Sequence, residues 1–172
     1  AGKTWQYDIT TNIWSELKSN IGGTDTRHIS NCYVYAYDKH LIGAYNSGKI
    51  LQLRDDLYQD DGAAITREIV SLPSYKADQA NSPLSKKIFL DKLQIDVETG
   101  IGATPTVTMQ ISKDSGRTYA STYTNTIPLT GNRMYWYRLG MTQNSFAVKI
   151  TFTANYKFIV LGAIALFRIG LH

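Results

Sequence analysis

Apolar and polar side chains alternate along several stretches of the second half of the chain. In residues 107–112, Val, Met and Ile alternate with Thr, Gln and Ser, and residues 93–98 and 148–153 repeat the pattern. Because successive side chains of a strand point to opposite faces, this period predicts strands with one buried face. About six strands are expected, at 88–98, 106–112, 118–125, 134–139, 146–154 and 158–169. With no helix-period segments between them, they predict an antiparallel β-sandwich over residues 88–172.

The first part of the chain predicts shorter strands joined by tight turns. Residues 4–18 form an expected hairpin, and short strands are expected at 32–37, 41–45 and 49–53. Asn46-Ser47-Gly48 between the last two is a strong hairpin-turn signal. This spacing is typical of propeller blades, with residues 63–72 as an outer strand or exit segment. Residues 1–72 are therefore predicted to be propeller-type antiparallel strands, the last blades of a larger propeller.

A polar segment separates the two regions. Residues 73–87 contain two prolines and show no period, which predicts a linker and a domain boundary. The whole chain is accordingly predicted to be all-β, with propeller-like hairpins followed by a sandwich.

The most apolar run of the chain is Phe158–Phe167, ten residues long. A membrane-spanning helix needs about 20 residues, so a buried strand at the centre of its sheet is predicted, with no membrane partner. The single cysteine, Cys32, excludes an internal disulfide and a cysteine-rich metal site. Its apolar setting predicts a buried, inert thiol.

The charge of the 172-residue chain, +4 overall, is unevenly distributed. Residues 1–82 carry 8 Lys/Arg and 10 Asp/Glu, whereas residues 83–172 carry 10 and 4. The net charge is therefore −2 for the first part and +6 for the second, and the positive charge of the second part favours an acidic partner there, protein or nucleic acid. Scattered solubilising charge is the alternative, because no basic run exceeds Lys86-Lys87.

Catalytic and metal-binding signatures are missing from the sequence. The three histidines, His28, His40 and His172, have no helical ligand spacing. The chain has neither a Gly-x-Ser-x-Gly elbow nor a glycine-rich phosphate loop before a helix. No enzyme activity, metal or cofactor is therefore predicted.

Four carboxylates lie close together at Asp55, Asp56, Asp60 and Asp61. Paired acids can serve glycoside hydrolysis or calcium binding, but the alternate-position ligands of a calcium loop are missing. A solvated acidic turn is predicted, with a surface for a basic partner as the alternative.

Aromatic residues cluster at Tyr135, Trp136, Tyr137 and Arg138. Exposed aromatic rings beside arginine can stack on bases or sugars, which makes this segment a candidate interaction surface. At strand spacing, Tyr135 and Tyr137 share one face while Trp136 and Arg138 share the other. One of the two faces is expected to belong to the core.

The turn at Ser112-x-Asp114-x-Gly116-x-Thr118-Tyr119 resembles the Asp-box of sialidases, Ser-x-Asp-x-Gly-x-Thr-Trp. The resemblance implies that Ser112 and Asp114 tie the turn and that Tyr119 packs beneath it. In sialidases the motif repeats across propeller blades, away from the catalytic centre. A single copy, with Tyr in place of Trp, indicates a structural turn. A carbohydrate-binding or sialidase-like β protein stays open as an alternative function.

Longer stretches resemble the packaged-DNA stabilisation proteins (tail accessory or tail hub proteins) of short-tailed phages. The resemblance runs from about Ser47 to Phe167. It is carried by Gly48–Leu53, Leu57-Tyr58, Asp60–Gly62, Ile65-x-Arg67, Lys87–Gly100, Val107–Tyr119, Trp136–Gly140 and the apolar last strand. Members of that family are longer than this chain, so further propeller blades are expected upstream.

This resemblance implies a structural virion protein without enzymatic activity. Such a protein is a head–tail connector that closes the portal channel, retains packaged DNA, and contacts the portal adaptor, tail needle and tailspike. It implies self-assembly into a ring, a location in the virion tail, and synthesis in the host bacterial cytoplasm. Opposite net charges suggest head-to-tail contact between neighbouring subunits. Direct contact with packaged DNA is a further possibility.

Overall fold

The computed structural model describes residues 2–22, 24–73, 87–143 and 145–170, and none of these residues forms a helix. All regular structure is antiparallel strand, which confirms the all-β expectation. The chain divides into two compact units, Ala1–Ile65 and Thr66–His172. Most of the predicted linker, together with His172, lies outside the described residues.

The first unit contains small antiparallel sheets. Its strands are β1 (Thr4–Asp8), β2 (Ile13–Ile21), β3 (Thr24–Arg27), β4 (Ser30–Ala36), β5 (Lys39–Ala44), β6 (Ile50–Leu53), β7 (Gln59–Asp60) and β8 (Ala63–Ala64). They form the sheets β1-β2-β3 and β4-β5-β6 and the ribbon β7-β8. The expected hairpins are therefore present, and β3 adds a strand that was not predicted. The described strands of this unit do not close into a propeller.

Few side chains of the first unit are shielded from solvent. Among its described residues, the buried hydrophobic side chains are Ile29 and Ile42. The buried Ser19 hydroxyl accepts a hydrogen bond from the Ile29 N–H at 3.0 Å. Cys32 is exposed, so the prediction of a buried thiol was wrong. The small sheets leave both faces of β4 in contact with solvent, because the burial of an apolar strand depends on a layer packed over it.

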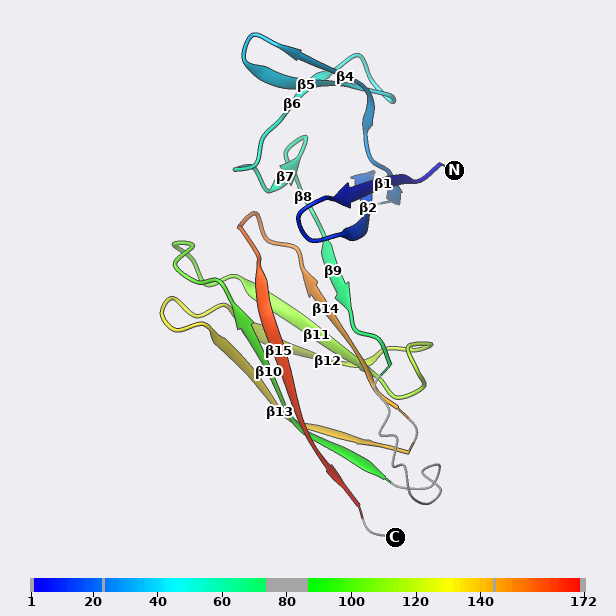
Figure 1. Cartoon of the computed structure of the whole chain (residues 1–172), viewed down its shortest axis with the longest axis vertical. Coiled ribbons are helices and arrows are strands. Elements are labelled where there is room, and N and C mark those ends of the chain that lie inside the picture. The colour runs from blue at the N-terminus through cyan, green and yellow to red at the C-terminus, as the bar shows by residue number, and fades with distance from the viewer. Residues whose placement is uncertain (1, 23, 74–86, 144, 171–172) are drawn as a thin grey trace. The chain divides into compact units, whose positions relative to one another are not determined.

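The second unit is a β-sandwich of two antiparallel sheets (Figure 1). Its strands are β9 (Arg67–Val70), β10 (Ile88–Val97), β11 (Thr106–Ser112), β12 (Ala120–Thr126), β13 (Arg133–Thr142), β14 (Ala147–Phe152) and β15 (Val160–Ile169). One sheet has the order β13-β10-β15 and the other β12-β11-β14-β9. The predicted sandwich is confirmed.

Strand β9 belongs to this sandwich, although it precedes the predicted linker. It pairs with β14, with Val70 opposite Lys149 and Arg67 opposite Phe152. The Ser71 N–H extends the ladder by donating to the Val148 carbonyl at 2.8 Å. Backbone pairing, which sequence composition does not reveal, places this strand in the second unit and not in the outer part of a blade.

The core lies between the two sheets and follows the predicted alternation. In β10, for example, Leu93, Ile95 and Val97 are buried while the residues between them are partly exposed. The rings of Phe152 and Phe158 stack at 4.5 Å between centroids. The buried core cluster comprises Ile88, Leu90, Leu93, Ile95, Val97, Val107, Met109, Ile111, Ile127, Met134, Trp136, Leu139, Phe146, Val148, Ile150 and Phe152.

Strand β15 lies at the edge of its sheet. The prediction that this most apolar strand occupies the centre was wrong, because β10 takes that position and pairs with β13 and β15 on its two sides. The side chains of Leu161, Ile164 and Leu166 on β15 are exposed as a result.

Candidate functional site

The loop between β11 and β12 is closed by the side chains of Ser112 and Asp114. The Ser112 hydroxyl donates to Asp114 Oδ1 at 2.5 Å and accepts from the Gly116 N–H at 2.8 Å. Asp114 Oδ1 also accepts from the Thr118 N–H at 2.8 Å and the Arg117 N–H at 3.1 Å. Its second oxygen accepts from the Thr118 hydroxyl at 2.6 Å. These are the contacts that the Asp-box pattern implies.

The backbone of this loop turns through two left-handed residues, Ser115 (φ 62°) and Gly116 (φ 88°). The Ser115 hydroxyl lies 2.7 Å from that of the fully buried Ser145, which connects the loop to the segment before β14. A Cβ on residue 116 would lie 3.5 Å from the Tyr119 hydroxyl. Lys149 Nζ lies 5.0 Å from the centroid of the half-buried Tyr119 ring. Ser115 and Tyr119 thus connect the loop to β14 and to the segment before it.

Hydrogen bonding favours the ionised form of Asp114. The bond from the Ser112 hydroxyl, followed by those from Thr118 and Arg117, holds the pKa of the Asp114 carboxyl well below its ordinary value of 3.8. A carboxyl whose pKa is lower in the folded state stabilises the fold above its ordinary pKa. That stability is lost as the pH falls from 3.8 towards the pKa of the folded state.

Replacing Asp114 with asparagine is expected to lower the melting temperature at pH 7, because an amide cannot accept all the bonds made by the carboxylate. The difference from the wild type should shrink as the pH is lowered below 3.8, because the Asp114 carboxyl of the unfolded wild type then takes up a proton while that of the folded state is still ionised. Thermal unfolding of both proteins between pH 7 and pH 2 measures this. A difference that stays constant over the whole range would contradict the assignment.

The acidic residues of the first unit are partly neutralised by the chain itself. Both carboxylate oxygens of Asp56 accept hydrogen bonds from the Arg54 guanidinium, Oδ1 from Nε at 2.8 Å and Oδ2 from Nη2, and this pairing lowers the pKa of Asp56. Asp61 pairs with Lys49 Nζ at 2.5 Å. Asp60 lies in β7, and Asp55 shares an open groove with Asp56. Within the described ranges, no His, Cys, Asp and Glu side chains group closely enough to hold a metal ion.

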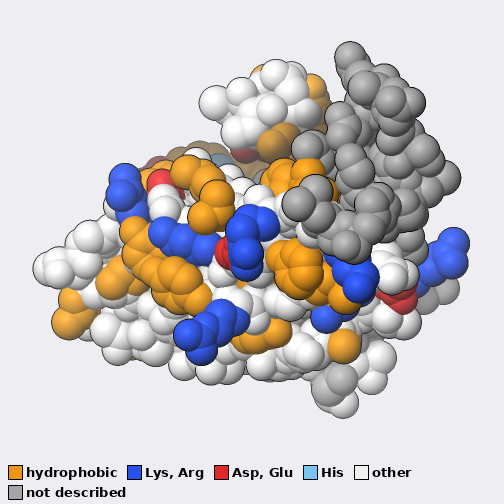
Figure 2. Space-filling model, turned by 90° about the horizontal axis from the view of Figure 1, so that it is seen from below, with side chains coloured by type: hydrophobic (Ala, Val, Ile, Leu, Met, Phe, Trp, Pro, Cys, Tyr) orange, Lys and Arg blue, Asp and Glu red, His pale blue; other side chains and the backbone are white. Residues whose placement is uncertain are grey.

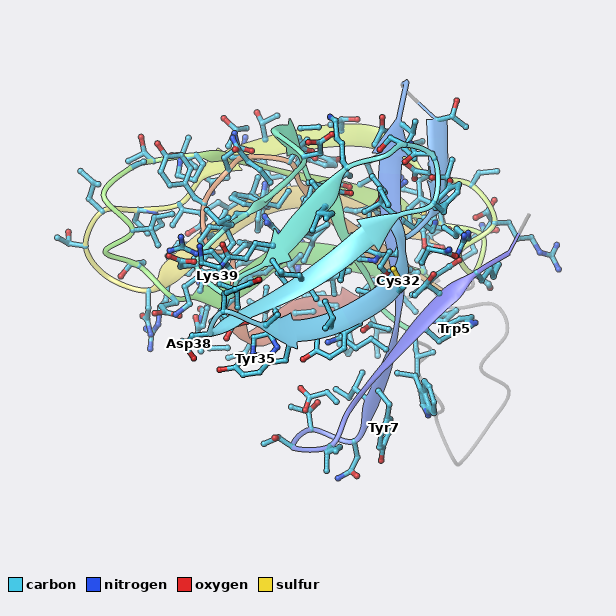
Figure 3. All side chains as sticks on the ribbon, turned by 90° about the horizontal axis from the view of Figure 1, so that it is seen from above. Trp5, Tyr7, Cys32, Tyr35, Asp38 and Lys39 are labelled. Atoms are coloured by element: carbon cyan, nitrogen blue, oxygen red, sulfur yellow. The ribbon has the colours of Figure 1, made fainter. Side chains whose placement is uncertain are left out.

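A cluster that the sequence analysis missed occupies the β4–β5 hairpin. The Tyr33 hydroxyl lies 2.7 Å from His40 Nδ1, and the Tyr35 ring lies 4.9 Å from that of His40. The Tyr35 hydroxyl donates to Asp38, which raises the pKa of Tyr35. Figure 3 shows Tyr35 and Asp38 at the tip of the hairpin, with Cys32 farther along β4. The sequence signal that could have revealed this cluster is the spacing of Tyr33 and Tyr35, two positions apart on one strand and therefore on the same face.

The structure separates the aromatic residues of β13. Trp136 is 5% exposed and belongs to the core, so it is not part of an interaction surface. Tyr135 and Tyr137 lie on the outer face with ring centroids 6.1 Å apart, and Tyr137 is 60% exposed. Lys92 Nζ lies 4.1 Å from the Tyr135 ring centroid. Alternate side chains of one strand point to opposite faces, which explains this division.

Arg138 does not follow that alternation. Its φ is +55°, and the register between β10 and β13 shifts beside it, between Leu90 and Lys92. The irregularity leaves Arg138 exposed next to Tyr137. On the side of the molecule shown in Figure 2, Lys and Arg side chains lie among hydrophobic ones, with few Asp or Glu.

Comparison with known families gives a match over residues 81–166, half of the chain, to the family described as bacteriophage P22 Gp10, β-sandwich. The chain belongs to this family. Membership in the P22 Gp10 family supports a structural protein of a phage tail, located in the virion. No curated protein matches the chain.

The P22 Gp10 match bears differently on the candidate sites. It includes the Asp-box loop and the outer face formed by Tyr135, Tyr137 and Lys92, which are parts of the matched sandwich. The acidic residues at 55–61 and the Tyr33–His40 cluster lie outside it. Within the matched sandwich, the Asp-box loop joins β11 to β12. The described residues contain no helix that could span a membrane.

Proposed function

We propose that the chain is part of a structural virion protein that helps to close the portal channel of a short phage tail and retain packaged DNA. In this role it connects the portal adaptor, tail needle and tailspike, and it assembles with further copies into a ring. The observation that carries this proposal is the P22 Gp10 match over residues 81–166.

The surface chemistry of the two units supports a role in assembly. Residues 1–65 carry a net charge of −2 and residues 66–172 a net charge of +6. Opposite charges favour contact between the first unit of one copy and the second unit of the next. A head-to-tail contact of this kind uses two different surfaces and closes into a ring when the rotation permits.

Light scattering tests the assembly part of this proposal. The full-length protein, alone and mixed with the ring-forming adaptor, is expected to give a mass of several subunits. A monomer in both samples contradicts ring assembly.

Retention of DNA is tested on particles assembled without the protein. Such particles are expected to package DNA and then lose it, so that the genome becomes sensitive to added nuclease. Particles that lack the protein and still protect their DNA contradict the proposed function.

Two other functions have a specific observation in their favour. The complete Asp-box hydrogen bonding is compatible with a sialidase-like or carbohydrate-binding protein, which binding to a glycan array or sialoside turnover would reveal. The +6 charge of the second unit favours direct contact with packaged DNA. Binding to duplex DNA that weakens steeply with added salt would support that contact.

A further inference from the structure

The two sheets of the sandwich have four edge strands, and three of them have features that discourage pairing with another chain. Strand β9 is four residues long and carries Arg67 and Glu68. Strand β12 has mostly Ser, Thr and Asn side chains. Strand β13 carries Arg133 and Arg138 and contains a register shift. Short length, polar or charged side chains and bulges protect edges from unwanted pairing.

Strand β15 lacks these protections. It is ten residues long, and it carries no charge from Val160 to Phe167. Within the described part of the chain it pairs with β10 alone, so the backbone groups along its other side have no strand partner. An exposed, long and apolar edge of this kind is a template for an added strand.

The side chains of β15 are also uncovered on both faces. Ile164 and Leu166 lie opposite Gln94 and Lys92 on the outer face and are 61% and 58% exposed. Phe167 lies opposite the buried Leu90 on the inner face and is still 42% exposed. A strand added beside β15 would therefore cover apolar surface on both faces as well as backbone groups.

The charges within and next to β15, those of Arg168 and Lys157, are already paired within the sandwich. Arg168 binds Asp91 through two hydrogen bonds of 2.5 and 2.9 Å. Lys157 binds Glu98 at 2.9 Å. The edge therefore offers no particular attraction to an acidic peptide or to nucleic acid. Its best complement is another uncharged strand with apolar side chains.

We propose that β15 is the edge at which a second copy of this chain adds a strand. Two edge strands of a second copy are at least seven residues long and rich in exposed apolar or aromatic side chains: its own β15, uncharged from Val160 to Phe167, and the uncharged β4 with Tyr33, Val34 and Tyr35. Pairing with β4 joins the +6 unit to a −2 unit, whereas pairing of β15 with β15 joins two +6 units through Val160–Phe167, which carries no charge. The inference rests on the self-assembly proposed above and names the strand that mediates it.

A matched pair of lysine substitutions tests the proposal in the full chain. Ile164→Lys places a charge on the outer face of β15, and Leu129→Lys places one in the loop between β12 and β13 of the same unit, at nearly equal exposure. Ile164→Lys is expected to weaken self-association about tenfold or more, measured by sedimentation equilibrium, because it puts an ammonium group into an apolar contact. Leu129→Lys should leave it unchanged. Circular dichroism checks that both variants fold.

The outcomes separate this inference from the broader proposal. Self-association that Ile164→Lys does not weaken, or that both variants weaken equally, overturns the assignment to β15 while leaving self-assembly intact. A wild type that stays monomeric at every concentration overturns both the β15 contact and the ring. The DNA-retention assay is unaffected by either result.

Cross-linking identifies the strand of the second copy. With Cys32→Ser and Ile164→Cys combined, a short bis-maleimide should join two copies through position 164 where β15 meets its own copy. With Cys32 retained, a link between positions 32 and 164 of different copies marks β4, and Cys32 alone is the control. Either link supports the proposal. The absence of both in samples that self-associate overturns it.

Discussion

Replacing Phe152 with alanine is expected to lower the free energy of unfolding of the second unit by about 3–5 kcal/mol. The Phe152 side chain is fully buried, and its ring stacks on Phe158 with the planes 11° apart. Removing the ring takes away buried apolar area and leaves a cavity where the two sheets meet. Urea denaturation followed by tryptophan fluorescence measures the change.

Phe167→Ala is the matched control for this substitution. It removes the same ring from a position that is 42% exposed, so less apolar area is lost from the buried surface and the loss of stability should be clearly smaller. Equal losses at the two positions would contradict the burial described for Phe152.

Gly116→Val is expected to destabilise the second unit by about 1–3 kcal/mol. Residue 116 has a φ of +88°, a conformation that a β-branched residue adopts only with strain. The turn must also keep its amide directed at the Ser112 hydroxyl, 2.8 Å away. Chemical denaturation of the variant and the wild type measures the cost.

Gly162→Val serves as the control for the glycine substitution. Gly162 lies in β15 with no positive φ and with open space around the position of a Cβ atom. Valine suits a strand, so this variant should be as stable as the wild type or slightly more stable. A Gly116→Val protein with wild-type stability would refute the requirement for a left-handed residue in the loop.

The strands could be predicted from sequence because their signal is local, whereas their order in the sheets could not. The alternation in residues 93–98 and 107–112 indicates which face is buried, and the structure agrees. The last strand has no alternation, so its composition shows that it could be buried without showing where it lies. Strand β9 has four residues, too few for a period, and its place depends on pairing with residues 149–152.

The candidate sites also divide into those built from local contacts, which could be predicted from the sequence, and those built from contacts between distant residues, which could not. The Asp-box turn could be predicted because every bond that closes it joins residues within four positions of each other. The burial of Trp136 followed from alternation once one face was known to be the core. The Tyr33–His40 cluster depends on the register of two strands, and closure of a propeller depends on blades far apart in sequence. Short turn motifs specify neither the register of two strands nor the closure of a propeller.

The pairing of β9 determines where this protein can be divided. A fragment beginning at residue 81, where the P22 Gp10 match starts, would lack β9 and leave the whole outer side of β14 open. It would also lack the Arg67 guanidinium that donates to the carbonyls of Ala154 at 3.3 Å and Tyr156 at 3.2 Å. A proteolytic or recombinant sandwich fragment should begin before Arg67, so that this strand stays with the sheet that it completes.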